Sequence, residues 1–401
     1  MQRKITSVSI IGGGASGLAS AISLVLFGGI DPNAIKVFEP RQPIRSNILV
    51  LPKPAVARLK ALGVASILKQ RNQIGNLDRL CFLRNEVEEQ VAEPMVVSPM
   101  DGHLIDLEDD DDEPFLEPVP MAEIIDAQKT GAGIVGVVIC DLERALRDRA
   151  EQLGIYIIEA AATDLVLNNQ SGYQIVLDDG SVDEPDLVIL AEGNSRRLVT
   201  RCLPIPIEVC SKQEHYARVH IKFNIGPILC TGFLNPKDPK SKFLVMGDPV
   251  QTSYAQTIIQ VKEPFNLVNG RHDECKTGTE PQYSFHEGSG FVLKEVAIDA
   301  RSVFHKLNLP QDVVFSSMAP RSFVVQDTML KTTTYENVVV IGDAAHSGHF
   351  LSGVGTAVGI LFDSDVLLKL IMGGSTAEFA ESMRSGTKEW FSYDKKTWFE
   401  G

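Results

Sequence analysis

The 401-residue sequence predicts an α/β fold of more than one domain-sized unit, and three observations support this prediction. A strand, a glycine-rich turn and a helix follow one another over residues 5–26. A second strand, turn and helix occupy residues 338–360. The chain between them contains alternating runs at residues 217–223 and 253–261, which are typical of half-buried strands. The length exceeds that of one ordinary core, so we expect two or three domain-sized units.

The first element is a strand of β-branched residues over positions 5–11, followed by a glycine-rich turn. Gly12, Gly14 and Gly17 match the pattern G-x-G-x-x-G. Glycine is required there for a tight turn, for close approach of a pyrophosphate to the backbone, and for close packing of helix on strand. Apolar residues then recur at helical spacing, at Leu18, Ala21, Ile22, Val25 and Leu26. The free N–H groups at the start of this helix would bind the anion.

A second strand and an acidic residue complete this unit. Residues 34–38 have the pattern of a strand, which closes a βαβ unit of about 30 residues. Glu39 follows 22 positions after Gly17, where an acid accepts hydrogen bonds from the ribose of an adenine dinucleotide. A carboxylate there also disfavours a 2′-phosphate. These residues favour dinucleotide binding over a purely structural turn, and they leave FAD and NAD both open.

The second strand–turn–helix pattern helps to choose between these cofactors. Its strand, residues 338–341, runs into Gly342 and Asp343, and its helix begins near Val354. An acid at the end of a strand can accept hydrogen bonds from a polyol such as ribityl. The amino terminus of the following helix can stabilise negative charge on the pyrimidine edge of a flavin. The alternative is one more structural crossover with a solvated aspartate.

Three motifs, in order, resemble those of the FAD-dependent aromatic hydroxylases, the group A flavoprotein monooxygenases typified by para-hydroxybenzoate hydroxylase. The first is G-G-G-A-S-G with the later E-P-R of residues 39–41. The second, at residues 186–197, is D-L-V-I-L-A-E-G-N-S-R-R. The third is G-D-A-A-H at residues 342–346, with G-V-G at 353–355. The resemblance covers most of the chain. It implies a Rossmann-like FAD-binding domain interleaved with a mixed-sheet substrate domain, and the chain adds a short C-terminal helical tail.

The resemblance also implies an activity and a set of cofactor-binding residues. NADH or NADPH and O2 would be used to hydroxylate or oxygenate an aromatic or polycyclic small molecule through a flavin C4a-hydroperoxide. The residues expected to bind FAD are Gly12, Gly14, Ala15, Ser16, Gly17, Glu39, Arg41, Asp343, Gly353, Val354, Gly355 and Thr356. No catalytic acid or base is identified, and His346 is expected to be a packed structural residue.

The chain departs from the family pattern in three places. Glu192, with Gly193 after it, stands where the family has Asp-Gly, and Ile139 stands where it usually has an arginine that contacts FAD. The proline of the last motif is replaced by Phe350, with His349 before it. That loop faces the substrate side of the flavin in relatives. We therefore expect His349 and Phe350 to face the substrate and to reshape its pocket.

The resemblance implies domains that are discontinuous in sequence, and the strand-like runs agree with this division. FAD-binding segments are expected at 1–75, 125–200 and 320–371, and substrate-domain segments at 76–124 and 201–319. Gly373 and Gly374 are expected to end the last long helix, so that residues 372–401 form a charged, partly helical tail.

Two other functions are compatible with the motifs. One is a two-component flavin enzyme that is reduced by a partner protein. A halogenase of this kind is disfavoured, because both tryptophans, Trp390 and Trp398, lie in the tail rather than in a W-x-W-x-I-P segment. The other is an FAD-binding protein that shelters or reshapes a metabolite without oxygenating it.

Composition excludes several classes of protein. The net charge of −14, with seven acidic residues between positions 106 and 113, disfavours nucleic acid as a partner. The six cysteines form no C-x-x-C pair, so neither a metal site nor a disulfide framework is expected. The apolar stretch at residues 15–30 is too short to span a bilayer, and the first strand leaves no room for a signal peptide. We therefore expect a cytoplasmic protein, possible partners being a reductase or a second copy of the chain.

Overall fold

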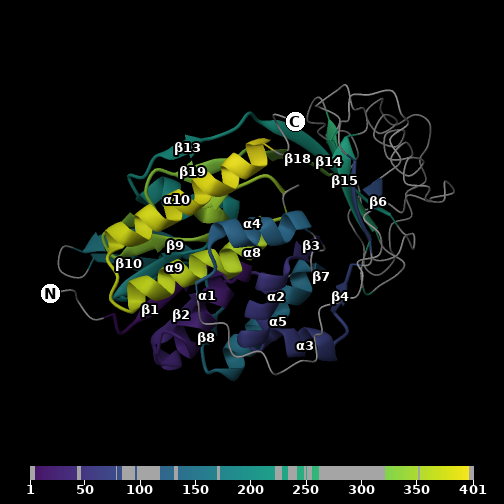
Figure 1. The fold of residues 1–401 in the computed structure, drawn as a ribbon. Coiled ribbons are helices and arrows are strands. Elements are labelled where there is room, and N and C mark those ends of the chain that lie inside the picture. Colours follow the sequence, from purple (N-terminus) through teal and green to yellow (C-terminus); the bar gives the residue numbers. More distant parts are fainter. Residues whose placement is uncertain are drawn as a thin grey trace, which may run out of the picture. The chain divides into compact units, whose positions relative to one another are not determined.

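The computed structural model divides the chain into two compact units (Figure 1). It describes residues 5–42, 47–77, 79–83, 95–96, 118–130, 134–168, 172–221, 228–233, 242–247, 250, 255–261, 321–350 and 353–396. The first unit comprises the described parts of 1–74, 103–212 and 326–400, and the second those of 75–102 and 213–325. The acidic run at 106–113 lies outside the described residues.

A six-stranded sheet forms the centre of the first unit. Its strands, in spatial order, are β20 (Thr334–Tyr335), β21 (Val338–Val340), β12 (Leu187–Leu190), β1 (Val8–Ile11), β2 (Ile35–Phe38) and β8 (Tyr156–Ile158). All neighbours pair in parallel except β20, which is an antiparallel edge strand. Every residue of β1, β12 and β21 is buried, because helices and loops cover both faces of a parallel sheet.

Helices of the first unit pack around this sheet. Their bounds are α1 (Ala15–Leu26), α2 (Lys53–Ala61), α3 (Val64–Gln70), α4 (Met121–Thr130), α5 (Ile139–Gln152), α6 (Arg197–Cys202), α8 (Gly355–Ile360) and α9 (Phe362–Ile371). Helix α1 contacts α5, α8 and α9. A hydrogen bond of 3.1 Å between Ser20 Oγ and Ser364 Oγ ties α1 to α9. The Rossmann-like arrangement expected from the sequence is confirmed.

Three small sheets and three short helical turns complete the unit. The sheets are β11 (Val182–Asp183) with β10 (Gly172–Leu177) and β9 (Ala162–Asn168); β13 (Ile207–Val209) with β19 (Thr328–Leu330) and β22 (His346–Ser347); and β3 (Ile48–Leu51) with β7 (Val135–Val138) and β4 (Ile74–Asn76). The 3-10 turns are η1 (Pro32–Ala34), η2 (Gly193–Ser195) and η3 (Gly342–Ala344). Turns η2 and η3 directly follow β12 and β21, so both lie at the same edge of the central sheet.

The C-terminal segment is a long helix, α10 (Thr376–Asp394). Helix α9 ends at Ile371, before Gly373 and Gly374 as expected, but the longer α10 follows, so α9 is not the last long helix. A capping box starts α10: the Ser375 side chain accepts the Glu378 N–H, and Glu378 accepts the Ser375 N–H. Figure 1 shows α10 beside α9, and its Trp390 is 1% exposed. The predicted helical tail is therefore part of the core.

The second unit contains a mixed seven-stranded sheet. In spatial order its strands are β18 (Arg321–Val325), β14 (Glu214–Ile221), β17 (Ala255–Val261), β16 (Lys242–Gly247), β15 (Ile228–Phe233), β5 (Arg79–Leu83) and β6 (Met95–Val96). Only β15 and β5 pair in parallel. The expected mixed sheet is confirmed, and β14 and β17 overlap the alternating runs predicted at 217–223 and 253–261.

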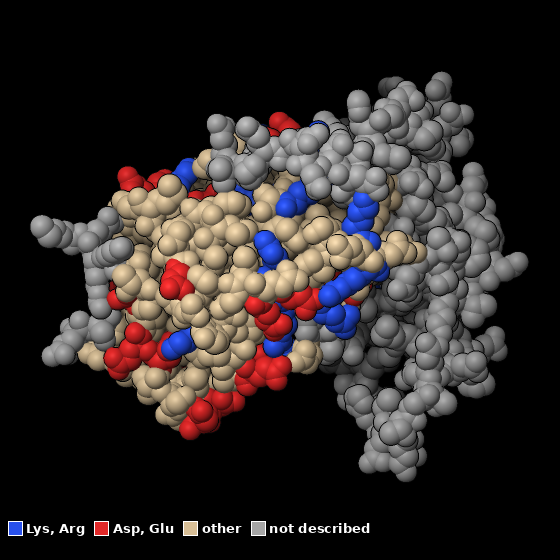
Figure 2. Space-filling model, turned by 90° about the horizontal axis from the view of Figure 1, so that it is seen from below, with Lys and Arg blue, Asp and Glu red and all other residues tan. Residues whose placement is uncertain are grey.

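Charges on the described surface are mixed. Figure 2 shows basic and acidic side chains beside one another on the face seen from below. An exposed pair such as Arg71–Asp148 (2.6 Å) contributes at most about 1 kcal/mol. None of the described helices combines the length and the hydropathy that a membrane crossing requires.

Candidate functional site

The turn between β1 and α1 has no room for side chains at two of its glycines. Gly12 has φ +111°, and a Cβ there would lie 2.3 Å from the carbonyl oxygen of Ala191 at the end of β12. A Cβ on Gly17 would lie 2.1 Å from the carbonyl oxygen of Gly12. The N-cap residue of α1, Gly14, makes no side-chain capping bond, and the first turn holds no acidic residue. The turn therefore presents bare backbone and a helix amino terminus, the arrangement that binds phosphate groups.

Glu39 lies beside this turn, at the end of β2. Its Oε2 accepts the Gly13 N–H at 2.8 Å, and its Oε1 accepts both the backbone N–H and the Nε of Arg41 at 3.0 Å. Burial raises the pKa of Glu39, but the hydrogen bonds from Arg41 and Gly13 outweigh it, and the pKa is lowered overall. The carboxylate is thus held ionised as an acceptor, and the Arg41 side chain that covers it is 75% exposed.

Ser16 packs away from the turn, between η3 and α8. A Cβ on Gly359 would lie 2.0 Å from Ser16 Oγ, and one on Gly342 would lie 2.7 Å from it. These two glycines are therefore needed to admit the serine side chain. Because its side chain packs there, Ser16 presents only its backbone N–H group at the start of α1.

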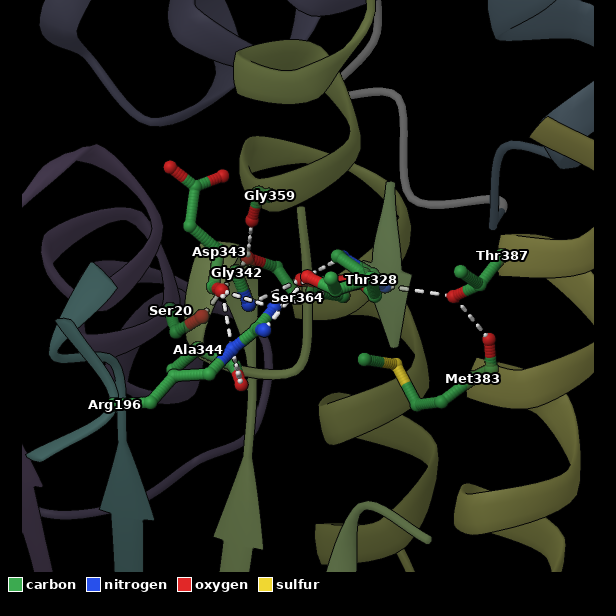
Figure 3. Close-up of polar contacts among 12 residues, drawn as sticks. Ser20, Arg196, Thr328, Gly342, Asp343, Ala344, Gly359, Ser364, Met383 and Thr387 are labelled. Carbon is green, nitrogen blue, oxygen red and sulfur yellow. Dashed lines mark hydrogen bonds and ion pairs between the residues drawn. The ribbon is translucent and has the colours of Figure 1, made fainter. Parts of the chain in front are cut away.

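Asp343 lies in η3, directly after β21. Its side chain is exposed, and Figure 3 shows it pointing away from the buried polar groups around it. The turn itself is held by hydrogen bonds from two sides. Gly342 N–H donates to Asp363 Oδ2 at 2.6 Å, and Arg196 donates to the carbonyl oxygens of Asp343 and Ala344.

The loop after η3 contains the two residues expected to face a substrate. His349 is 2% exposed, and its ring stacks on Phe350 with centroids 5.0 Å apart. Gly353 has φ +65°, Val354 is fully buried, and α8 starts at Gly355, close to the predicted start. The contact of His349 and Phe350 with a substrate stays a prediction.

The comparisons with known proteins rest on structure alone. No protein-family model matches this sequence, and no curated protein does. A flavoprotein/dehydrogenase from Cytophaga hutchinsonii matches with a TM-score of 0.68 and 16% identity, over 98% of this chain and 87% of that one. p-Nitrophenol 4-monooxygenase from Pseudomonas putida matches with a TM-score of 0.63 and 14% identity, over 99% of this chain and 88% of that one. The Diels-Alderase PyrE3 of pyrroindomycin biosynthesis matches with a TM-score of 0.62 and 17% identity, over 97% of this chain and 72% of that one.

The chain has the fold of the flavoprotein monooxygenases. The para-hydroxybenzoate hydroxylase-like fold predicted from the three motifs is confirmed.

His346 has a structural role in this flavoprotein monooxygenase fold, as the sequence predicts. The ring is 2% exposed and lies edge-on to Trp390. Thr387 Oγ1 donates to Met383 O at 2.7 Å, so it accepts from His346 Nδ1, also at 2.7 Å. The other ring nitrogen, Nε2, lies 3.1 Å from Asp363 Oδ2. The ring therefore links α10 to α9, and both of its nitrogens have partners in these helices.

The arginine expected before α5 in relatives has no replacement on that helix. Ile139 is buried there, and its N–H donates to Asn47 O at 2.8 Å. Arg144 pairs with Asp141 at 3.1 Å, and Arg147 pairs with Glu151 at 3.3 Å. Both arginines are thus engaged in ion pairs along α5.

Glu192, the acid of the second motif, caps α6. Its Oε1 accepts the Leu198 N–H at 2.8 Å and the Val199 N–H at 3.4 Å. Burial raises the pKa of Glu192, and these hydrogen bonds only partly offset the effect. The extra methylene relative to aspartate lets the carboxylate reach the first turn of α6, whose N-cap residue provides no side-chain cap.

We predict that two Glu192 variants reveal two separate contributions of this side chain to stability, its capping of α6 and its raised pKa. Glu192→Ala removes the cap, so it should lower the free energy of unfolding by about 1 kcal/mol at neutral pH. Because the folded-state pKa lies above the ordinary value of 4.5, the folded state favours the protonated acid. The stability of the wild type relative to Glu192→Gln should therefore fall as pH rises from 4.5 through the folded-state pKa. Urea unfolding of the three proteins across this range measures both effects, and a pH-independent difference from Glu192→Gln would contradict the second.

The sequence reasoning missed Arg196, Asp363 and Thr387. Arg196 lies inside the second motif, but its contacts are with the third motif, almost 150 residues later. Asp363 and Asp365 interrupt the apolar helix α9, and acids among apolar residues were the available signal of buried polar partners.

Proposed function

We propose that the protein is an FAD-dependent monooxygenase that uses NADH or NADPH and O2 to hydroxylate or oxygenate an aromatic or polycyclic small molecule. The main support is the turn after β1, where backbone atoms exclude side chains at Gly12 and Gly17 and the buried Glu39 lies against Gly13. A dinucleotide diphosphate requires this bare backbone, and its ribose requires this acid.

The described residues fit FAD at several points. The start of α1 would bind the diphosphate, with Gly12, Gly14, Ala15, Ser16 and Gly17 contributing backbone. Glu39 would accept hydrogen bonds from the adenosine ribose once the exposed Arg41 side chain moves aside. The exposed carboxylate of Asp343 would accept hydrogen bonds from ribityl, and the backbone of residues 353–356 would meet the flavin edge.

Bound flavin would supply the redox chemistry, by accepting a hydride and reacting with O2. The protein's own contribution is binding, orientation and the exclusion of water. Val354 and His349 are buried next to the expected flavin edge, and they would limit the access of water there. The choice of NADH or NADPH, the substrate, a reductase or second copy as partner, and the cytoplasmic location stay predictions.

The test begins with flavin uptake. We expect the isolated protein to be yellow, or the apoprotein to bind added FAD stoichiometrically with quenching of flavin fluorescence. Glu39→Gln should weaken this binding by about 10-fold, since a charged acceptor of ribose hydroxyl groups is lost. Gln174→Ala, on the exposed side of β10, is a matched control that should bind as the wild type does. A colourless wild-type protein that takes up no FAD would disprove the function.

The second step identifies the reaction. Anaerobic stopped-flow mixing of the holoprotein with NADH or NADPH, with and without a panel of phenols and polycyclic aromatics, should show flavin bleaching that substrate accelerates. Oxygen should then restore the flavin and yield hydroxylated product. Reduction by neither nucleotide, but by a flavin reductase, would indicate the two-component enzyme instead.

A non-oxygenating function is the second candidate, and one comparison favours it. A protein named a Diels-Alderase shares this fold over 97% of the present chain. Stoichiometric FAD that NADH, NADPH and a flavin reductase all fail to reduce under anaerobic conditions, with or without the aromatic panel, would support this candidate over the monooxygenase.

A further inference from the structure

Arg196 has an unusual backbone and a buried charge. Its φ of +45° lies in the left-handed region, which costs a residue with a Cβ roughly 1–2 kcal/mol. Its side chain is 4% exposed. An unfavourable backbone angle and a desolvated charge at one position both need compensation from the contacts of the guanidinium.

The guanidinium contacts two neighbouring elements, the η3 turn and strand β19. Nε donates to the carbonyl oxygen of Ala344 at 2.9 Å, and Nη2 donates to that of Asp343, also at 2.9 Å. Nη1 donates to Thr328 Oγ1 on β19 at 2.7 Å. Figure 3 shows the guanidinium lying against the turn from below the Asp343 side chain. Burial lowers the pKa of Arg196, and the negative charge of Asp343 opposes that shift.

The other end of the turn is held by an acid. Asp363 is fully buried and accepts the Gly342 N–H at 2.6 Å, and His346 fixes the same carboxylate. A cation thus binds the carbonyl groups of the turn and an anion binds its N–H group. Each charge interacts favourably with the peptide dipoles that it meets, so the turn has one preferred orientation. Its only outward-pointing charged group is the Asp343 carboxylate.

We propose that Arg196 is a positioning residue for Asp343: it holds the peptide carbonyls of the turn so that the carboxylate is oriented before the cofactor arrives. The proposal rests on the proposed function, in which Asp343 binds the ribityl chain of FAD. A carboxylate that is oriented in advance loses less conformational entropy on binding, which raises affinity without any contact between Arg196 and the cofactor.

A double-mutant cycle on FAD affinity tests this proposal. The dissociation constant of FAD from the apoprotein is measured by flavin fluorescence for wild type, Arg196→Met, Asp343→Asn and the double variant. We expect Arg196→Met and Asp343→Asn each to weaken binding by about 10- to 100-fold. If Arg196 acts through Asp343, the double variant should bind within about threefold of Asp343→Asn alone.

Two further proteins separate positioning from general destabilisation. Arg197→Met is the matched control: that neighbouring arginine donates to Ala162 O at 2.6 Å, away from η3, and its loss should leave FAD affinity unchanged. Arg196→Lys keeps the charge but has one ammonium in place of a fork, so it should bind FAD with intermediate affinity and serves where Arg196→Met does not fold. Guanidinium ion at tens of millimolar should restore FAD binding to Arg196→Met and not to Asp343→Asn.

The outcomes are distinguishable from those of the proposed function. A wild type that binds no FAD overturns the proposed function and this proposal together. A wild type that binds FAD, with Arg196→Met unchanged or with strictly additive losses in the double variant, overturns this proposal alone. Non-additive losses that guanidinium reverses support it.

Discussion

Gly17→Ala should prevent FAD binding and destabilise the apoprotein. A Cβ at this position would lie 2.1 Å from the carbonyl oxygen of Gly12 and 3.2 Å from Ala191 Cβ. Both neighbours are held by strands, β1 pairing with β12 over its full length, so the backbone of the turn must shift. Alanine favours a helix by about 1 kcal/mol over glycine, but overpacking of this kind costs about 1–3 kcal/mol or more. The steric term therefore exceeds the gain in propensity.

We expect the free energy of unfolding to fall by about 2 kcal/mol and FAD affinity to fall by at least about 100-fold, since a displaced turn no longer fits the diphosphate. Chemical denaturation of the apoprotein and a fluorescence titration with FAD measure the two effects. Gly180→Ala is the control. Gly180 has φ +82°, but a Cβ added there would have nothing within 4 Å. This variant should therefore lose about 1 kcal/mol of unfolding free energy and bind FAD normally. Normal FAD binding by Gly17→Ala would show that the turn does not contact the cofactor.

Arg58→Met should cause a large loss of stability in the first unit while leaving the FAD residues intact. Arg58 on α2 is 1% exposed, and its Nη1 lies 2.7 Å from Asp365 Oδ1 on α9. Asp365 Oδ2 also accepts the Val119 N–H at 3.0 Å, just before α4. Removing the arginine leaves a buried carboxylate without its counter-ion, which costs about 3–5 kcal/mol.

The double variant Arg58→Met/Asp365→Asn should recover much of this loss. Asparagine is neutral, so no buried charge remains, and its amide oxygen can still accept the Val119 N–H. Urea unfolding of the wild type, both single variants and the double variant gives the coupling energy of the pair. A loss in Arg58→Met that Asp365→Asn does not reduce would contradict the assignment of the cost to the unpaired charge.

The pH dependence of Arg58→Met provides a second check on the same variant. Burial raises the pKa of Asp365 above 3.8 even though Arg58 opposes the shift, so loss of Arg58 should raise it further. The folded state then binds more protons than the unfolded state between 3.8 and the folded-state pKa, and stability falls as pH rises through that window. The deficit of Arg58→Met should therefore be smallest at acid pH and should grow toward neutral pH.

Local sequence patterns predicted the main elements because each depends on neighbours in the chain. The strand expected at residues 34–38 differs from β2 by one residue, and the strand expected at 338–341 differs from β21 by one residue. The prediction that the helix before Gly373 is the last long helix is wrong, although a local signal for α10 exists. Ser375 and Glu378 form a capping box that marks the start of α10, and this signal was present in the sequence.

The sequence by itself determined the Rossmann-like crossover, because glycine spacing, strand-end acids and apolar periodicity are properties of short segments. The mixed sheet and the full set of candidate FAD residues were expected from the resemblance of three motifs to a known family. Only the tertiary structure decided which polar side chains hold those segments in place. Arg196, Asp363 and Thr387 meet their partners across 17 to 148 positions of sequence. No spacing rule predicts such contacts, because they depend on how β12, β21 and α9 pack, and a buried charge is satisfied by whichever backbone that packing brings within reach.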